Sequence, residues 1–247
     1  EAHRTAGEDR SKENNFSLVL HDEIIPAKKR LFYTATPNFT ELSEGDRSQE
    51  ELHSMDNEEL YGKVVYDYPY SRALEEGVVA PLRIQAPILT EGEIEAYRVL
   101  NDLPESDRSL IISELSLNKV IETTGQNKIL SFHNGLQRAE RFAGRLNETL
   151  GPEGYNVTFI SGDSSIDERR RAFEVMETTP SVVTSVDALG EGVNSKAVQV
   201  ALFADPRHSV RVILQNLGRI QRIDPNDPNK IGTIVCPIII DEKSKDT

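Results

Sequence analysis

Short apolar runs alternate with amphipathic segments along the second half of the chain, from Asn127 onward. The runs predict strands at residues 128–133, 155–160, 181–186, 198–203 and 232–240. Between them, apolar positions at helical spacing predict helices at residues 136–150, 165–176 and 210–217. Strands and helices that alternate in this way form βαβ crossovers, which build a mostly parallel sheet covered by helices on both faces. The pattern therefore predicts an α/β fold with a doubly wound parallel sheet.

The first half of the chain is less regular. A short apolar strand is expected at residues 30–37, where small hydroxyl residues and Pro37 end it, and a polar surface excursion follows to residue 60. The next expected elements are a short helix with a glycine stop, a strand and a pair of helices, at residues 71–77, 78–89 and 91–118. We therefore expect three regions: a first unit at 1–90, a helical linker at 91–125 and a second unit at 126–247.

Charge is distributed unevenly over these regions. The net charge of the chain is −13, with −12 in residues 1–125 and −1 in residues 126–247. A strongly acidic balance argues against a passive nucleic-acid coat protein, since binding to phosphates normally leaves a basic footprint. Arginines nevertheless cluster in the second half, at positions 138, 141 and 145, at 169–171, and at 207, 211, 219 and 222. Each cluster predicts either a locally positive face or a solvated helix face balanced by nearby acids.

Several classes of protein are disfavoured by what the sequence lacks. The single cysteine, Cys236, excludes an internal disulfide, and the five scattered histidines form no metal-ligand cluster with it. No stretch approaches the roughly 20 apolar residues of a membrane helix, and the first residues do not resemble a secretion signal. We expect no metal site and no membrane partner, and an intracellular location in the cytoplasm or nucleus.

The most informative segment is residues 215–222, Gln-Asn-Leu-Gly-Arg-Ile-Gln-Arg, which follows an apolar run. Arg219 and Arg222 are three positions apart at a helix end, so they project to the same side. A guanidinium keeps its charge, so the pair can neutralise the oxygens of a γ-phosphate held by a neighbouring domain. The alternative is that the two arginines pair with Asp224 and Asp227 on the surface.

Two further segments follow predicted strands. Gly190-Glu191-Gly192 comes directly after the strand at 181–186, and the loops at the carboxyl ends of strands line the ligand crevice of an open α/β sheet. Gly162 follows the strand at 155–160 and precedes a helix, where a phosphate could approach the backbone and the helix N-terminus. The alternative for the second segment is an ordinary helix capped by Asp163, Ser164 or Ser165.

The order of these motifs resembles that of superfamily-two DEAH-type helicases and translocases. Glu1-Ala2-His3-Arg4 resembles the end of a DEAH box, and Thr34-Ala35-Thr36 resembles the Ser/Thr-Ala-Thr motif about thirty residues later. Residues 1–7 and 61–66 further resemble helicases related to the motors of restriction enzymes. The resemblance implies the end of a first RecA-like domain and nearly all of a second one, with ATP between them and nucleic acid across both.

The family resemblance also implies a role for each motif residue. Glu1 would activate the attacking water, and Arg219 and Arg222 would reach the γ-phosphate. The residues expected beside the nucleotide are His3, Gly190, Glu191, Gly192, Asn194, Gln215 and Gly218. Those expected at the nucleic acid, with DNA favoured over RNA, are Thr34, Thr36, Ser131, His133, Gly162 and Thr184. Asn194 stands where the family has an aspartate, although its amide can still hydrogen-bond a sugar hydroxyl.

One family element is missing from this sequence. No G-x-x-x-x-G-K-[ST] loop occurs, so the main ligands of ATP and Mg²⁺ are expected outside it, and we expect the chain alone to hydrolyse ATP negligibly. The resemblance leaves open whether nuclease or methylase domains accompany it. One alternative is a helicase-fold binding module without catalysis. Another is a different doubly wound enzyme, such as a glycosyl or phosphoribosyl transferase, which leaves the arginine pair unexplained.

Overall fold

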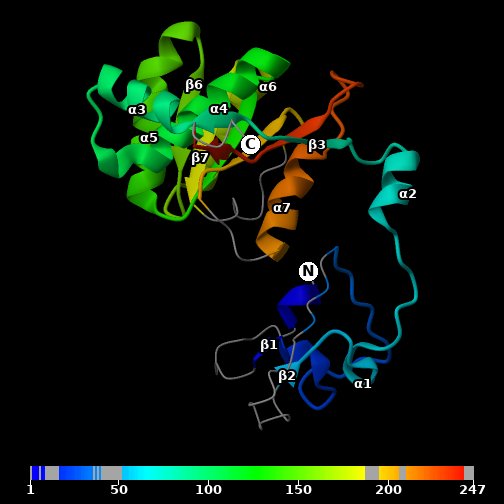
Figure 1. The fold of residues 1–247 in the computed structure, drawn as a ribbon. Coiled ribbons are helices and arrows are strands. Elements are labelled where there is room, and N and C mark those ends of the chain that lie inside the picture. The colour runs from blue at the N-terminus through cyan, green and yellow to red at the C-terminus, as the bar shows by residue number, and fades with distance from the viewer. Residues whose placement is uncertain are drawn as a thin grey trace. The chain divides into compact units, whose positions relative to one another are not determined.

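The computed structural model describes residues 2–5, 7–8, 17–35, 37, 39, 52–186, 195–205 and 210–241 (Figure 1). The chain forms two compact units, Glu1–Tyr68 and Pro69–Thr247. None of the helices in the described ranges has the length and apolar character needed to span a membrane.

The first unit contains short elements only. They are the 3-10 helices η1 (Ala2–Thr5) and η2 (Ser17–Leu20), the antiparallel strand pair β1 (Gly7–Glu8) and β2 (Leu52–His53), and the helix α1 (Glu58–Tyr61). The strand expected at 30–37 is not formed in the part of this unit that the structure describes. Leu31 and Tyr33 are exposed, and the backbone N–H of Ala2 donates to the carbonyl of Tyr33 (3.0 Å). A strand requires a ladder of such bonds to a neighbouring strand.

The second unit is built on a six-stranded parallel sheet, which confirms the predicted α/β class. Its strand order is β3-β9-β8-β5-β7-β6, and every neighbouring pair is parallel. The strands are β3 (Leu82–Gln85), β5 (Lys128–His133), β6 (Asn156–Ile160), β7 (Ser181–Val186), β8 (Val200–Phe203) and β9 (Gly232–Val235). The central strands are rich in β-branched and aliphatic residues because both of their faces are buried.

Helices cover both faces of this sheet. The long helices are α4 (Arg108–Thr124), α5 (Leu136–Thr149), α6 (Ile166–Thr178) and α7 (Val210–Ile220). Alternate residues of β5 point to opposite cores: Ile129 packs in a cluster with residues of α4 and α5, whereas Leu130 packs with residues of α6 and α7. The helix pattern predicted from the sequence is therefore confirmed, and the two cores enclose the sheet from both sides.

The boundary between the units differs from the expected one. β3 pairs with β9, and a second small sheet joins β4 (Ile88–Thr90) to β10 (Ile238–Ile240). Helix α3 (Glu91–Leu100) packs on α4, and Leu117 and Val120 of α4 belong to a sheet core. Residues 69–125 thus lie in the second compact unit, whereas we had expected a boundary at 90 and a helical linker after it. Strand pairing with residues about 150 positions away determines this placement.

The remaining elements of the second unit are short. Helix α2 (Tyr70–Glu75) ends before Gly77, which has a positive φ of 65°, as the predicted glycine stop requires. The 3-10 helices η3 (Glu105–Asp107) and η4 (Gly151–Glu153) precede α4 and β6. The single strand expected at 232–240 is two strands, β9 and β10, separated by Cys236 and Pro237. Proline lacks the N–H that would continue a ladder.

Candidate functional site

The arginine pair lies on a turn that is held firmly to the sheet. Leu217 and Ile220 at the end of α7 are buried in the core, which fixes the helix just before the turn. The carbonyl of the next residue, Gln221, accepts a hydrogen bond from the N–H of Ala80 (2.7 Å). An added Cβ at Gly232 would lie 3.0 Å from the carbonyl oxygen of Ile220, so the start of β9 also closely approaches the helix end. The backbone that carries the arginines is therefore preorganised.

Arg219 and Arg222 are both partly buried, and their charges act on each other. Burial lowers the pKa of Arg219 to about 10, and the neighbouring charge of Arg222 contributes to this shift. Burial also lowers the pKa of Arg222. Both side chains remain cationic at neutral pH, although their charged forms are disfavoured by desolvation and mutual repulsion. Gly218, directly before Arg219, is exposed.

The turn that follows is organised by buried polar groups. The carboxylate of Asp224 is buried and accepts the N–H of Asn226 (2.9 Å), and the N–H of Asp227 donates to the carbonyl of Asp224 (3.0 Å). Asp224 and Asp227 also both act on Lys230, whose pKa they raise against a larger lowering by burial. Asp224 thus supports the turn, and both aspartates act on its lysine.

A second feature lies at the carboxyl edge of the sheet, where β5 and β8 end side by side. The chain leaves β5 through α5 toward β6, and it leaves β8 through α7 toward β9 on the other side. Ligands of doubly wound sheets bind where the crossover direction changes in this way. The buried carboxylate of Asp205 joins the two loops here, because it accepts the N–H of Asn134 (2.8 Å) and pairs with Arg138.

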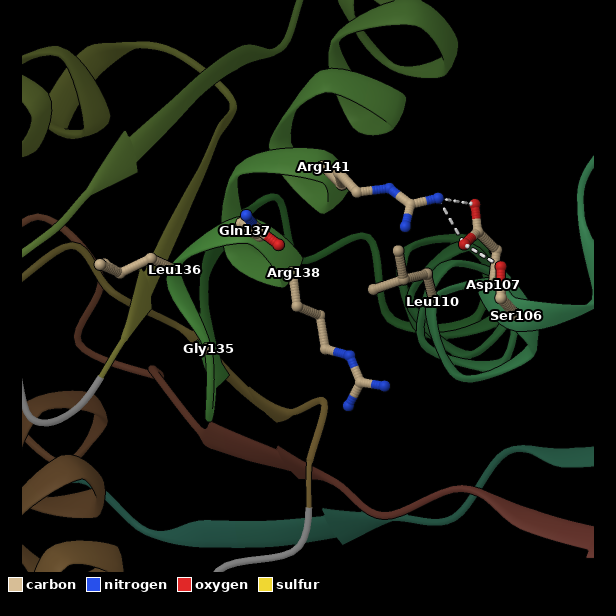
Figure 2. Close-up of a pocket in the computed structure, with 8 residues that line it drawn as sticks. All are labelled: Ser106, Asp107, Leu110, Gly135, Leu136, Gln137, Arg138 and Arg141. Carbon is tan, nitrogen blue, oxygen red and sulfur yellow. Dashed lines mark hydrogen bonds and ion pairs between the residues drawn. The ribbon is translucent and has the colours of Figure 1, made fainter.

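A pocket of about 470 Å³ opens at this edge, between α5 and the start of α4 (Figure 2). Its lining residues are Ser106, Asp107, Leu110, Gly135, Leu136, Gln137, Arg138 and Arg141. Gly135 is the N-cap of α5 and offers no side chain to the first-turn N–H groups. Free N–H groups at a helix N-terminus favour an anion. The pocket thus combines two arginines with the positive end of a helix.

The arginine cluster of α5 is largely neutralised by the protein itself. Each of its three arginines pairs with a buried carboxylate: Arg138 with Asp205, Arg141 with Asp107 and Arg145 with Glu114. Figure 2 shows Arg141 pointing to Asp107, and both residues line the pocket. The side chains of Arg138 and Arg141 remain 43% and 55% exposed, whereas that of Arg145 is 14% exposed. Balance by acids is therefore confirmed for this cluster, and only its first two arginines are accessible to a ligand.

Three residues expected at the nucleic acid point into the core instead. Ser131, His133 and Thr184 have no exposed surface. The hydroxyl of Ser131 lies 2.7 Å from Nε2 of His133, and the hydroxyl of Thr184 donates to a carbonyl of α5 (3.2 Å). The ring of His133 packs against Phe142. Direct side-chain contact with nucleic acid does not fit these positions, because both faces of β5 and β7 are covered by helices.

Gly162 is exposed at the end of β6, in a turn that the next helix fixes. A guanidinium nitrogen of Arg169 donates to the carbonyls of Ser161 (2.9 Å) and Gly162 (2.8 Å). Ser165 is the N-cap of α6 and forms a capping box with Glu168. The capped-helix interpretation of this segment is confirmed, and Ser165 is the capping residue. The exposed backbone at Gly162 is still accessible to a ligand.

Several expected site residues fall outside the described part of the chain. They are Glu1, Thr36, Gly190, Glu191, Gly192 and Asn194, together with the side chains of His3 and Gln215. Thr34 is described and partly buried in the first unit. Within the described residues, no group of His, Cys, Asp and Glu side chains could hold a metal ion. These residues therefore do not offer Mg²⁺ a ligand set.

The sequence analysis missed three residues of the site. Asp107 and Asp205 bind the pocket arginines from positions 34 and 67 residues away, so no local pattern marks them. A weak signal exists for Asp205, because it directly follows an apolar strand in the same way as the Gly-Glu-Gly loop does. Lys230 lies in a polar turn, where nothing in the sequence predicts a buried cation.

Part of the second unit matches a known domain family. Residues 108–224 match the model of the helicase conserved C-terminal domain. The second unit thus has the RecA-like fold of a helicase C-terminal domain.

Individual relatives agree with this class. The "Probable helicase A859L" of African swine fever virus (isolate Pig/Kenya/KEN-50/1950) is 26% identical over 262 residues, which cover 99% of this chain and 26% of the relative. The chain therefore spans about a quarter of that protein.

Two solved structures have a similar fold. One is the ATP-dependent Type ISP restriction-modification enzyme LlaBIII bound to DNA, with a TM-score of 0.77 and 21% identity over 99% of this chain and 18% of that chain. The other is a fragment assigned to an HsdR subunit of a type I restriction enzyme from Vibrio vulnificus YJ016, with a TM-score of 0.56 and 18% identity. The alignment covers 82% of this chain and 43% of the chain in that structure. Identities this low establish the fold alone.

Proposed function

We propose that the chain is part of an ATP-dependent motor that acts on nucleic acid, with DNA favoured over RNA. In this proposal the first unit belongs to the end of an ATP-binding RecA-like domain, and the second unit is its helicase C-terminal partner. The solved structure with the higher TM-score is described as ATP-dependent and as bound to DNA, which supports both the nucleotide and the choice of DNA.

The observation that carries the proposal is the preorganised pair of partly buried arginines at the end of α7. Both guanidinium groups are partly buried beside each other, and burial lowers the pKa of each. A guanidinium can contact phosphate oxygens through two parallel N–H groups. Arg219 and Arg222 would therefore stabilise the charge that develops on the γ-phosphate of ATP. When bound, ATP and its Mg²⁺ supply the phosphoryl group and the metal charge.

Other residues receive roles in the same proposal. Glu1 would activate the attacking water. The residues that would lie beside the nucleotide are His3, Gly190, Glu191, Gly192, Asn194, Gln215 and Gly218. Thr34 and Thr36 would couple the nucleotide site to the nucleic acid through their hydroxyl groups.

We place the nucleic-acid surface of the second unit at the carboxyl edge of its sheet. The pocket at the start of α5 exposes Arg138 and Arg141. The turn at Gly162 exposes its backbone after β6, and only β7 separates β6 from β5 in the sheet. Phosphates bind to arginines, backbone N–H groups and helix N-termini. Ser131, His133 and Thr184 would support this edge from inside the core and would not touch the ligand.

The test is nucleic-acid-stimulated ATP hydrolysis by the complete protein that contains this chain, with Arg219→Lys and Arg222→Lys variants. Lysine keeps the positive charge but loses the planar fork, so at least one substitution is expected to lower turnover substantially, toward the 10³–10⁵-fold that a finger arginine typically contributes. Arg170→Lys is the matched control, because Arg170 is an exposed residue of α6 that pairs with Asp167 and Glu174 on the surface. Its turnover should equal that of the wild type.

Two results would contradict the proposal. One is wild-type turnover in both variants, which would remove the arginines from catalysis. The other is nucleic-acid binding by the complete protein without any ATP hydrolysis. That second result would favour the helicase-fold binding module.

A further inference from the structure

Lys230 is a buried cation that bridges two parts of the second unit. Its residue is 4% exposed, and its ammonium donates to the carbonyl of Arg222 (2.8 Å) and to the carbonyl of Lys196 (2.5 Å). An ammonium has three N–H donors and no acceptor, and a buried one must be hydrogen-bonded. Lys230 thus uses its charge on main-chain oxygens from two separate segments.

Both bridged segments belong to motifs of the proposed site. Arg222 is the second arginine of the α7 turn. Lys196 follows the Gly-Glu-Gly loop, only two residues after Asn194. Next to it, the hydroxyl of Ser195 donates to the carboxylate of Glu177 (3.0 Å). The chain that leaves the loop is therefore held at two successive residues, one by Glu177 and one by Lys230.

The charges around Lys230 fit a built bridge. Asp224, Asp227 and Glu177 attract its ammonium, and Arg222 repels it. Two of these acids come from the 224–230 turn and the third from α6, so two separate elements contribute negative charge near the lysine. A surface lysine would have water in place of these partners. Burial of the ammonium therefore has a desolvation cost, and its hydrogen bonds hold two loops in place.

We propose that Lys230 is a positioning residue that locks the Arg222 turn to the segment after the Gly-Glu-Gly loop. The lock acts on backbone carbonyls. It therefore fixes the backbone position from which the Arg222 side chain extends and the backbone position just after the loop. The inference rests on the proposed function for its effect on turnover, whereas its effect on the two segments is independent of that function.

The experiment compares Lys230→Met with the wild type in the complete protein by hydrogen–deuterium exchange and by nucleic-acid-stimulated ATP hydrolysis. Methionine fills similar space without donors. Exchange in residues 195–199 and 221–232 is expected to rise at least tenfold. Turnover should fall by about 10²-fold with little change in the KM for ATP, because a small misplacement of a catalytic group has this effect. Lys230→Arg, which retains donors and charge, should recover part of the protection.

Lys128→Met is the matched control. Lys128 also donates its ammonium to a carbonyl, that of Glu177 (2.8 Å), but in an exposed place. This variant should leave exchange in the 221–232 segment and turnover as in the wild type. Unchanged exchange in folded Lys230→Met would overturn the proposal. The proposal would also be overturned if exchange in the two segments rises in Lys230→Met while its turnover equals that of the wild type.

The same measurements separate this inference from the proposed function. If the wild-type protein hydrolyses no ATP, the motor proposal fails, and the exchange data alone still decide whether Lys230 locks the two segments. If Lys230→Met does not fold, Lys230→Arg gives the decision, since a lock that needs donors predicts intermediate protection and a mere space filler predicts none.

Discussion

Glu114 carries a carboxylate in the interior of the protein, where its side chain has no exposed surface. Its two oxygens are bound by the hydroxyl of Tyr97 (2.9 Å) and by Nε of Arg145 (3.0 Å), so the charge is both paired and hydrogen-bonded. Burial, followed by the charge of Glu114, raises the pKa of Tyr97 to about 12. A buried pair of this kind adds little net stability when complete, but removal of one partner is costly because the other charge remains buried.

We therefore expect Glu114→Gln to lower the free energy of unfolding by about 3–5 kcal/mol, since it leaves Arg145 without its counter-charge. Glu95→Gln is the control, because Glu95 pairs with Arg98 in an exposed part of α3. That change should have little effect on the free energy of unfolding, because exposed ion pairs contribute little to stability. Urea unfolding of both variants measures the difference. Equal effects would show that the buried ion pair contributes no more to the free energy of unfolding than the exposed one.

Lys230 gives the protein a pH-dependent stability at the residue scale. Burial lowers its pKa from 10.5 to about 8, against the attraction of Asp224, Asp227 and Glu177, and Arg222 lowers it further. Between these two pH values the unfolded chain binds more protons than the folded one, so the free energy of unfolding gains a positive slope with pH. Below pH 8 the lysine is charged in both states and the contribution is flat.

The expected result is that the stability of the wild type relative to Lys230→Met increases as pH rises from 8 toward 10.5. Other groups that titrate in this range are common to both proteins and cancel in the difference. Denaturant unfolding at pH 7.5 and at 9.5 makes the comparison. A constant difference would mean that Lys230 has an ordinary pKa in the folded protein.

Candidate site residues could be picked out from the sequence only where a motif is contiguous. Arg219 and Arg222 stand out in the sequence, whereas Asp107 and Asp205 contact their arginines only after folding. Ser131, His133 and Thr184 were expected at a ligand, although the uninterrupted apolar runs around them indicate strands buried on both faces. If both faces of these strands are buried, then every side chain on them points inward, including the three polar ones.

At the scale of elements, the end of α7 depends on the close approach of β9. A Cβ added at Gly232 would lie 2.8 Å from a methyl group of Leu82 and 3.0 Å from the carbonyl oxygen of Ile220. The carbonyl is backbone and cannot give way by rotation. Gly144 differs, because it lies in the exposed interior of α5 and an added Cβ would meet nothing within 4 Å.

We expect opposite effects from the same substitution at these two glycines. Gly144→Ala should raise the free energy of unfolding by about 0.4–1 kcal/mol, since alanine favours the helix and restricts the unfolded chain. Gly232→Ala should lower it by about 1–3 kcal/mol, because a packed junction must shift. Thermal and urea unfolding test both. A neutral Gly232→Ala would indicate that the contact between β9 and α7 is loose.

Helices and strands of the second half follow local periodicity, which is why residues 127–240 were predicted closely. Several helices and strands before residue 127 were also predicted, but the sequence did not show that they belong to the second unit. β3 pairs with β9, and α4 contributes to the core beneath β9, at sequence separations of more than 100 residues. Local patterns show that a strand exists, but they do not show which sheet it joins.

At the scale of the whole molecule, charge is divided unevenly along the chain. The acid excess lies in residues 1–125, whereas the arginine pair of the α7 turn and the two exposed arginines of the pocket lie later in the chain. The second unit contributes charge for a phosphate, but the described residues contribute no metal ligands. The sequence also has no phosphate-binding loop. In the proposed function, the parts that hold the phosphates and the metal would therefore be supplied from outside these residues.

This division predicts that the 247-residue chain hydrolyses ATP negligibly by itself, with or without nucleic acid. Positioning of the phosphates and the metal supplies most of the acceleration of phosphoryl transfer, so an arginine pair without them has nothing to stabilise. The measurement is phosphate release by the purified chain and by the complete protein under identical conditions, with Arg219→Lys chain as the background reference. Nucleic-acid-stimulated turnover by the chain alone, lost in that variant, would contradict the division and place a full catalytic site within these residues.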